Sequence, residues 1–196
     1  ALGTVPPAAS PLAARDAGSA KRRGRLVHAL LQHLPALAPE RRHSAALAWL
    51  DRPGNELAPG EAGRLAARVM ALLAHPDLAP LFGPDSRAEV PLSGMVRGQV
   101  VGGLVDRLAV LADRVLVADY KTNRRPPADV AATPVMYLRQ MAAYRAVLAA
   151  IFPDRPIECV LVWTEDARPV WLPGALLDAH GLIGSAGAPI FEATNP

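Results

Sequence analysis

The sequence is poor in cysteine and in aromatic residues, with one cysteine and 5% Phe, Trp and Tyr among 196 residues. The single cysteine, Cys159, lies in the apolar run 157–163, where its expected role is that of a small buried hydrophobe. One cysteine excludes an intramolecular disulfide, a four-cysteine zinc site and a four-cysteine iron–sulfur cluster. The sequence therefore predicts a protein of a reducing compartment without an iron–sulfur cluster.

Long hydrophobic runs and two common signals are also lacking. No apolar run approaches the roughly 20 residues that span a membrane, and the first residues lack the pattern of a signal peptide. The phosphate-binding motif GxxxxGK[ST] does not occur. We therefore expect a cytoplasmic protein with no membrane partner, no bound nucleotide and no ATPase activity in this fragment.

Positive charge is what the chain does have, and it is clustered. The formal net charge is only +3, yet lysines and arginines gather in three groups. These groups are Lys21, Arg22, Arg23 and Arg25, then Arg41 and Arg42, and then Arg124 and Arg125. Such clusters permit a polyanionic partner, and they are about as common on solvated faces and at helix ends.

The length of the chain is typical of one domain with extended ends. Residues 1–20 have no apolar period and are mostly Ala, Pro, Gly and Ser, which predicts a flexible linker. A helical stripe of leucines then repeats every four residues until Pro35 ends it. We therefore expect a linker over residues 1–20, one domain over residues 21–182 and a C-terminal tail over residues 183–196.

The order of the predicted elements is typical of an α/β fold. Helical periods come first, over residues 23–34, 41–50 and 60–74. The expected strands are residues 89–92, 95–101, 103–111, 115–121, 157–164 and 168–172. Further helices are expected from a cap at Thr133 and Pro134 to about residue 151, and near residues 174–180. Residues 115–121 are apolar on both faces, so this strand should lie at the centre of a mixed sheet flanked by helices.

Two aspartates become neighbours if the chain turns back at residues 112 and 113. A tight hairpin there pairs residues whose numbers add up to 225, so Asp106 would face Asp119 across two strands. The Cβ atoms of such partners are about 4.5–5.5 Å apart. Lys121 follows Asp119 by two residues and would lie on the same face. Two carboxylates at this distance repel one another unless a cation lies between them.

Carboxylates, carbonyl oxygens and water are the ligands that Mg²⁺ and Mn²⁺ prefer. A metal that polarises a phosphate and activates water, beside a lysine that positions the water, is a known arrangement for phosphodiester hydrolysis. The competing interpretation is an ordinary salt-bridged hairpin, which is the commoner meaning of an isolated Asp-x-Lys. A three-residue turn would also shift the register and send one carboxylate to the other face.

Four segments supply independent support: RGRLVHALLQHL, GLVDRL, VLVADYKTNRRPP and QMAAYRAVL, in this order and separation. Together they resemble the C-terminal nuclease domain of AddA, the helicase-nuclease subunit of bacterial double-strand-break repair and a relative of RecB in the PD-(D/E)XK superfamily. The resemblance covers residues 22–172. It implies a restriction-endonuclease-like α/β fold, with a mixed central sheet flanked by helices and a helical N-terminal segment.

The resemblance also implies roles for residues of the site. The implied metal ligands are His28, Asp106, Asp119 and the Tyr120 carbonyl. Asp106 would end its strand, and Gly24, one turn before His28, would let the first helix approach the sheet closely. Lys121 would orient or activate the attacking water. Without this resemblance, a single helical histidine would more often be a structural residue than a ligand.

Further residues complete the implied site. Gln140 and Tyr144 are four residues apart on one helix face and would lie beside the scissile phosphate, although Tyr144 alone fits a core position equally well. Glu89 resembles the acidic residue of the family's first core strand, and a strand-end surface charge is the alternative. Contacts with the DNA backbone are expected from Thr122, Asn123 and Arg124, for which an ordinary loop is the alternative.

The sequence therefore predicts a Mg²⁺-dependent deoxyribonuclease domain, exonuclease or endonuclease, in which Mn²⁺ substitutes and the substrate is single-stranded DNA at processed double-strand breaks. The implied partners are single-stranded DNA, the helicase part of the same full-length protein and a second, AddB-like subunit, at the bacterial nucleoid. The alternatives are a non-catalytic module that binds DNA ends or docks a subunit, and a salt-bridged sheet protein of unrelated function. No helicase activity is expected of this fragment.

Overall fold

The computed structural model describes residues 11–122 and 126–181, with only the backbone described for residues 11–17. At its centre lies a five-stranded sheet in the order β1-β2-β3-β4-β5. The strands are β1 (Ser86–Val96), β2 (Gln99–Val110), β3 (Val115–Lys121), β4 (Ile157–Trp163) and β5 (Arg168–Leu172). Neighbouring strands are antiparallel except β3 and β4, which are parallel. The sheet is therefore mixed, as the sequence predicts.

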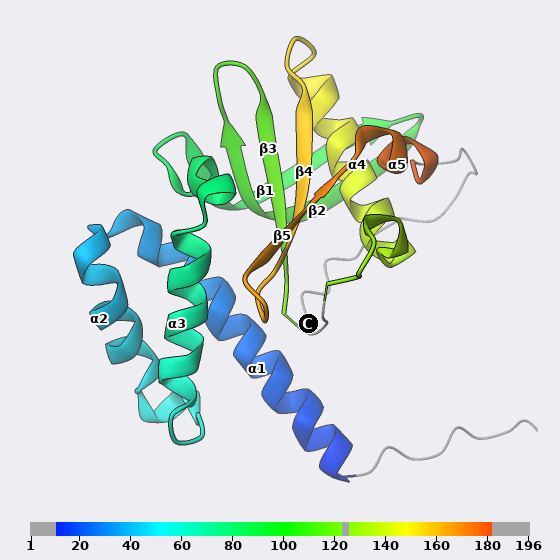
Figure 1. The fold of residues 1–196 in the computed structure, drawn as a ribbon. Helices are drawn as coiled ribbons and strands as arrows, with labels where there is room; N and C mark the ends of the chain where they lie inside the picture. The colour runs from blue at the N-terminus through cyan, green and yellow to red at the C-terminus, as the bar shows by residue number, and fades with distance from the viewer. Residues whose placement is uncertain (1–10, 123–125, 182–196) are drawn as a thin grey trace, which may run out of the picture.

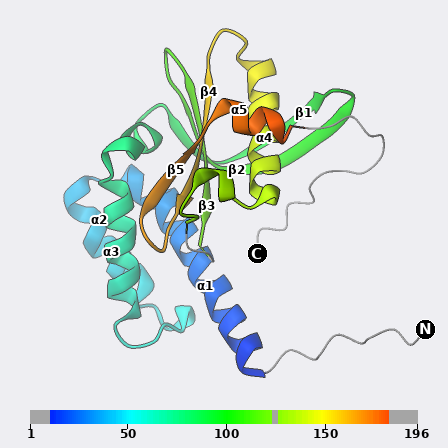
Figure 2. The same ribbon diagram turned by 45° about the vertical axis from the view of Figure 1, so that its right-hand side comes forward.

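Helices cover both faces of the sheet (Figures 1 and 2). On one face lie α1 (Pro11–His33), α2 (Pro39–Leu50) and α3 (Glu61–Leu73), and on the other α4 (Val135–Ile151) and α5 (Gly174–Ala179). Short 3-10 turns occupy Leu34–Ala36, Pro53–Asn55, Pro76–Phe82 and Val130–Ala132. Alternate residues of β3 enter the two hydrophobic clusters, with Leu116 on the α1 side and Val117 on the α4 side. The predicted α/β fold, a mixed sheet flanked by helices, is confirmed.

The first helix begins earlier than the sequence pattern suggests. Because α1 starts at Pro11, residues 11–20 of the expected flexible linker are helical, and residues 1–10 lie outside the described part of the chain. The alanines of this stretch favour a helix, and proline is tolerated in a first turn. The absence of an apolar stripe was therefore a poor guide to the backbone conformation of this segment.

Two long strands replace the three short ones predicted between residues 89 and 111. β1 and β2 are joined by Arg97 and Gly98, whose φ angles of 50° and 78° are those that a two-residue type I′ turn requires. Gly94, which the pattern treats as a break, lies within β1. A Cβ atom added at Gly94 would lie 2.8 Å from Cγ1 of Val147, so this glycine lets α4 approach the sheet.

The hairpin of β2 and β3 has the predicted register. Residues 107–110 pair with residues 115–118, and each pair adds up to 225, with the turn at residues 112 and 113. The pairing stops one step before Asp106 and Asp119. The register that brings these two aspartates to the same level of the sheet is therefore confirmed, although they are not themselves a ladder pair.

The start of α4 differs from the predicted cap. Val135 is the first helical residue and Pro134 is the capping residue, without a side-chain hydrogen bond. Thr133 consequently lies one position too early to accept from the first free amides of the helix. It is buried, and its Oγ1 has no hydrogen-bond partner among the described residues. The expected role of Thr133 as N-cap is wrong for this reason.

Within the part of the chain that the structure describes, no single helix is long and apolar enough to cross a membrane. One pair, Glu61–Leu73 with Pro76–Phe82, reaches that length and composition when taken together, with a bend of 90° between its two members.

Candidate functional site

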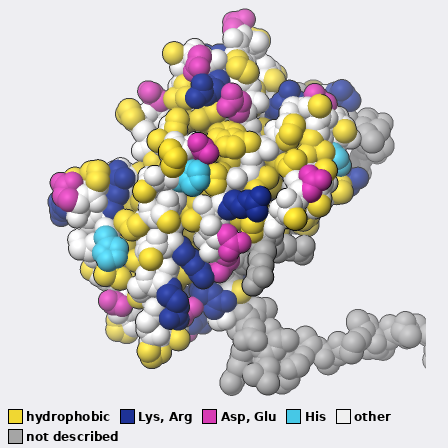
Figure 3. Space-filling view, viewed as in Figure 1, with side chains coloured by type: hydrophobic (Ala, Val, Ile, Leu, Met, Phe, Trp, Pro, Cys, Tyr) yellow, Lys and Arg dark blue, Asp and Glu magenta, His cyan; other side chains and the backbone are white. Residues whose placement is uncertain are grey.

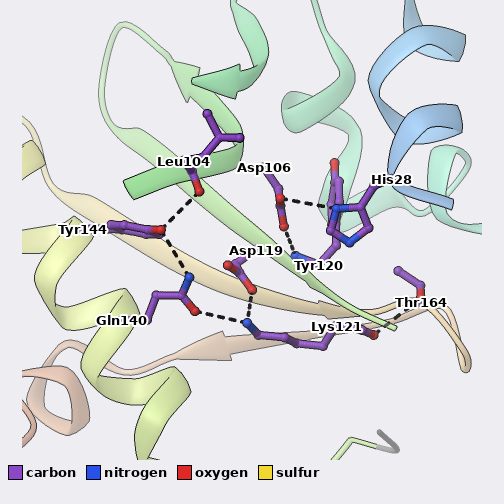
Figure 4. A network of polar contacts seen from close by, with 9 residues as sticks. All are labelled: His28, Leu104, Asp106, Asp119, Tyr120, Lys121, Gln140, Tyr144 and Thr164. Atoms are coloured by element: carbon purple, nitrogen blue, oxygen red, sulfur yellow. Dashed lines mark hydrogen bonds and ion pairs between the residues drawn. The ribbon is translucent and has the colours of Figure 1, made fainter. Parts of the chain in front are cut away.

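The candidate residues come from four elements that meet at the sheet (Figure 4). They are His28 of α1, Asp106 of β2, Asp119, Tyr120 and Lys121 of β3, and Gln140 and Tyr144 of α4. Both aspartates are buried, with exposed fractions of 7% and 5%. Asp106 lies inside β2 and not at its end, which corrects that part of the resemblance. The structure thus gathers residues from both helical layers around two buried carboxylates.

Strand β2 changes the face that it presents to α4 at Asp106. Val105 and Leu108 both belong to the hydrophobic cluster on the α4 side, although strict alternation would place residues three apart on opposite faces. The neighbouring strand is distorted at the same level, because Glu89 has a φ of 52°, a left-handed conformation that is uncommon for residues other than glycine. Backbone strain of this kind clusters at functional sites, where the surrounding structure enforces it.

The carboxylate of Asp106 makes two contacts. Its Oδ2 accepts a hydrogen bond from the Tyr120 amide at 2.5 Å, and its Oδ1 lies 3.5 Å from Nδ1 of His28. The Asp119 carboxylate instead forms an ion pair with Nζ of Lys121. The expectation that the two carboxylates face one another as a cross-strand pair is therefore corrected (Figure 4). The face change in β2 is the reason, since regular alternation does not continue through Asp106.

A group of three side chains is arranged as metal ligands would be. One ligand atom each of His28, Glu89 and Asp106 lies within 4.8 Å of the others. Two carboxylates and an imidazole suit a divalent cation, since carboxylates favour Mg²⁺ or Mn²⁺ and an imidazole is a ligand of divalent transition metals. Glu89, expected only as acidic support, thus belongs to the group most suited to a metal. Asp119 lies outside this group while it contacts Lys121.

The three side chains of this group shift the pKa values of His28 and Glu89. Burial lowers the pKa of His28, but the hydrogen bond and charge of Asp106, together with the charges of Asp119 and Glu89, outweigh burial and raise that pKa above its ordinary value. Burial and the charge of Asp106 raise the pKa of Glu89, against the opposing effect of His28. The carboxylates thus destabilise one another and favour a bound cation, either a proton or a metal ion.

Lys121 is the first member of a chain of polar contacts that crosses from β3 to α4 (Figure 4). Besides its ion pair with Asp119, its Nζ donates to Oε1 of Gln140 at 3.2 Å. Nε2 of Gln140 donates to Oη of Tyr144 at 3.2 Å, and Oη of Tyr144 donates to the Leu104 carbonyl at 3.1 Å. Gln140 and Tyr144 therefore hold the lysine ammonium in one place from the helix side.

The charge of Asp119 depends on its two neighbours. Burial raises the pKa of Asp119 to about 6, because desolvation and the charge of Asp106 outweigh the attraction of Lys121. The Lys121 side chain is itself largely buried, at 13% exposure, so its pairing with Asp119 keeps both charges away from bulk water. Burial and the charge of Asp106 would favour a further cation beside this carboxylate.

Sequence reasoning missed Tyr137 and Thr164. Nζ of Lys121 lies 4.0 Å from the centre of the Tyr137 ring, a cation–π distance, and that ring packs edge-on against Trp163. The amide of Thr164 donates to the Lys121 carbonyl at 3.0 Å and so fixes the end of β3. Tyr137 precedes Gln140 by three residues, which places both on one side of α4. That spacing was a usable signal.

The predicted close approach of α1 to the sheet is confirmed. A Cβ atom added at Gly24 would lie 2.7 Å from Oγ1 of Thr122, the residue that follows Lys121. Thr122 therefore packs against the first helix, and its expected contact with DNA stays a prediction. Asn123 and Arg124, expected to contact the DNA backbone as well, lie outside the described residues.

A second close approach shapes the α4 side. A Cβ atom added at Gly103 would lie 2.5 Å from Oη of Tyr144. Only a residue without a side chain lets the Tyr144 hydroxyl reach the Leu104 carbonyl beside it. The glycine of the segment GLVDRL therefore has a local role, because it makes room for the tyrosine that supports Gln140.

Comparison with known proteins bears on this arrangement. A family model described as the PD-(D/E)XK nuclease superfamily matches residues 5–176. The matched range contains every candidate residue named above, in both helical layers and in the sheet. No curated protein sequence matches the chain.

Proposed function

The chain belongs to the PD-(D/E)XK nuclease superfamily, and on this basis we propose that it is a metal-dependent deoxyribonuclease that hydrolyses single-stranded DNA. The observation that carries the proposal is the position of Lys121 on β3, next to the strand that carries the buried Asp106, with its ammonium held by Asp119 and Gln140. An ordinary surface salt bridge needs neither this burial nor the supporting hydrogen bonds.

The residues that would hold the metal are His28, Asp106 and Glu89, with Asp119 and the Tyr120 carbonyl as further ligands, and we propose Mg²⁺ as the ion. A divalent cation bound there would polarise the scissile phosphate and lower the pKa of the attacking water. Asp106 is central to this set because it contacts both His28 and the backbone of β3. Its hydrogen bond with Tyr120 fixes the carboxylate before any ion arrives.

Lys121 has the chemistry that hydrolysis of a phosphodiester requires beside the metal. Its ammonium would donate a hydrogen bond to the attacking water or to a phosphate oxygen, and it would offset negative charge that grows on the phosphate. The water oxygen gives up a proton and forms the new bond to phosphorus, while the bond to the 3′ oxygen breaks and that oxygen takes up a proton from solvent. The products are a 5′-phosphate and a 3′-hydroxyl.

The wider context is part of the same proposal. The four segments that resemble AddA support a role as the C-terminal nuclease domain of a helicase-nuclease, paired with an AddB-like subunit and active at double-strand breaks in homologous recombination. We propose residues 21–182 as this domain, preceded by the helical residues 11–20. We propose a cytoplasmic, nucleoid-associated location.

Metal-dependent cleavage tests the proposal. We expect the chain to cut end-labelled single-stranded DNA when Mg²⁺ or Mn²⁺ is present, and we expect Asp119→Ala to cut at least about 100-fold more slowly, because the lysine loses its counter-charge and the metal loses a ligand. EDTA should abolish cutting by the parent protein. Equal rates for the parent protein and the Asp119→Ala variant would refute the proposal. Binding of DNA ends without any cutting would favour a non-catalytic module instead.

Tyr137 gives a finer test of the lysine's placement. Tyr137→Leu removes the ring beneath the ammonium, and a cation–π contact of about 0.5–2 kcal/mol corresponds to a loss of about 2- to 30-fold in kcat. Tyr137→Phe keeps the ring and should retain the parent rate within about twofold. The measurement is kcat at saturating metal and substrate. If the phenylalanine variant loses as much as the leucine variant, the ring is not what positions Lys121.

A further inference from the structure

The four cations of residues 21–25, in the middle of α1, are of two kinds. Nη1 of Arg22 lies 2.6 Å from Oε2 of Glu56, and Nη1 of Arg23 lies 3.5 Å from Oε1 of Glu61, so both arginines are paired with the α2–α3 layer. Lys21 and Arg25 are exposed, and neither forms an ion pair within residues 11–122 and 126–181. Two of the four charges are therefore neutralised by the fold, and two face solvent.

Helix geometry places the two solvent-facing cations on the side of α1 that leads to the site. Lys21 and Arg25 precede His28 by seven and three residues, which at 3.6 residues per turn puts all three on one side of the helix. They lie about 10 Å and about 4.5 Å from His28 along the axis, at 1.5 Å per residue. Gly24, beside Arg25, packs against Thr122 directly after Lys121.

The carboxylates of the site would repel a DNA strand, and cations beside the site would reduce that repulsion. Glu89, Asp106 and Asp119 bring three carboxylates, and the ammonium of Lys121 is already paired with one of them. Without a metal ion, a polyanionic strand that enters this site meets an excess of negative charge, and cations placed beside the site reduce that repulsion. Figure 3 shows Lys and Arg side chains, with Asp and Glu side chains among them, over the part of the molecule where α1 and α3 lie in Figure 1.

We propose that Lys21 and Arg25 form a phosphate-binding edge on α1, which holds the sugar–phosphate backbone of single-stranded DNA next to the cleavage site. This inference rests on the proposed function, and it adds the path by which the strand approaches. The two side chains are about one helical turn apart and bind phosphates as charges without reading bases. The edge therefore contributes affinity that is independent of sequence and sensitive to salt.

The salt dependence of binding tests the edge. Anisotropy of a dye-labelled oligothymidylate is measured in EDTA, where no cleavage occurs, over about 50–200 mM salt. Each phosphate contact to a single strand adds about 0.7 to the slope of log K against log salt concentration, so Lys21→Gln with Arg25→Gln should lower that slope by about 1.4. The matched control, Arg22→Gln with Arg23→Gln, removes the same charge from the same helix and should leave the slope within about 0.3 of the parent value.

The outcomes separate this inference from the proposed function. Equal salt slopes for the Lys21/Arg25 variant and the parent protein would overturn the phosphate-binding edge. So would an equal loss of slope in the Arg22/Arg23 control, or no binding of DNA by the parent protein. Cleavage by the parent protein in Mg²⁺ is measured separately. Its absence would refute the proposed nuclease activity, while the salt slopes would still test whether Lys21 and Arg25 bind phosphates. Thermal unfolding of both double variants, at exposed or partly exposed sites, should match that of the parent protein.

Discussion

Replacing Lys121 with methionine is expected to slow the cleavage of single-stranded DNA by about 10²–10⁴-fold while Mn²⁺ binding is retained. The ammonium is placed by Asp119, Gln140 and the Tyr137 ring, and methionine has a similar length without the charge or the protons. The metal-suited group of His28, Glu89 and Asp106 does not include Lys121, so its ligands stay in place. The rate is measured by single turnover on labelled DNA, and Mn²⁺ binding by calorimetry.

The lysine variant needs a control for charge and for folding. Arg139→Met removes an exposed cation next to Gln140 on α4 and should retain the parent cleavage rate. Because Asp119 loses its buried counter-charge in Lys121→Met, the double variant Lys121→Met with Asp119→Asn, which removes both charges, should unfold at a higher temperature than the single variant. Parent-like cleavage by Lys121→Met would remove Lys121 from the chemistry.

Asp106→Asn is expected to weaken Mn²⁺ binding by at least about 100-fold and to abolish cleavage with it. The amide side chain has nearly the same shape and still offers an oxygen to the Tyr120 amide, so the backbone contact survives while the charge that faces His28 is lost. Loss of a charged ligand should lower the metal affinity at least as much as loss of a residue that hydrogen-bonds to a ligand, which typically lowers it 10- to 100-fold.

Asp113→Asn provides the matched control for the metal ligand. Asp113 lies in the turn between β2 and β3, and its side chain is 67% exposed and paired with Arg114. The same chemical change at this position should leave Mn²⁺ affinity as in the parent protein. Calorimetric titration of both variants makes the comparison. Unchanged affinity in Asp106→Asn would mean that the ion binds without this carboxylate.

Patterns between residues close in sequence were sufficient to predict the strands at the centre of the site. Residues 115–121 fill both faces with apolar side chains, and they form the buried strand β3 at the centre of the sheet. The turn at residues 112 and 113 fixes the register of β2 and β3 because a two-residue turn allows one pairing only. Local patterns also predict the helix that carries Gln140 and Tyr144, but only the resemblance connects these two residues to the site of Lys121.

Long-range packing decided what the sequence could not predict. The face change at Asp106 and the left-handed Glu89 occur at the same level of the β1–β2 pair, and strand alternation does not predict either of them. As a result, Glu89 joins His28 and Asp106, while Asp119 turns to Lys121. The roles assigned to these residues stay predictions, and the geometry makes each of them testable.

The most direct test of the central claim, that the buried carboxylates hold a divalent cation, is anomalous diffraction from crystals of the protein grown with Mn²⁺. We expect an anomalous peak within coordination distance of Asp106 and His28, with Glu89 or Asp119 as a further ligand. Well-ordered density for these side chains without a peak between them, at a Mn²⁺ concentration that supports cleavage, would contradict the central claim.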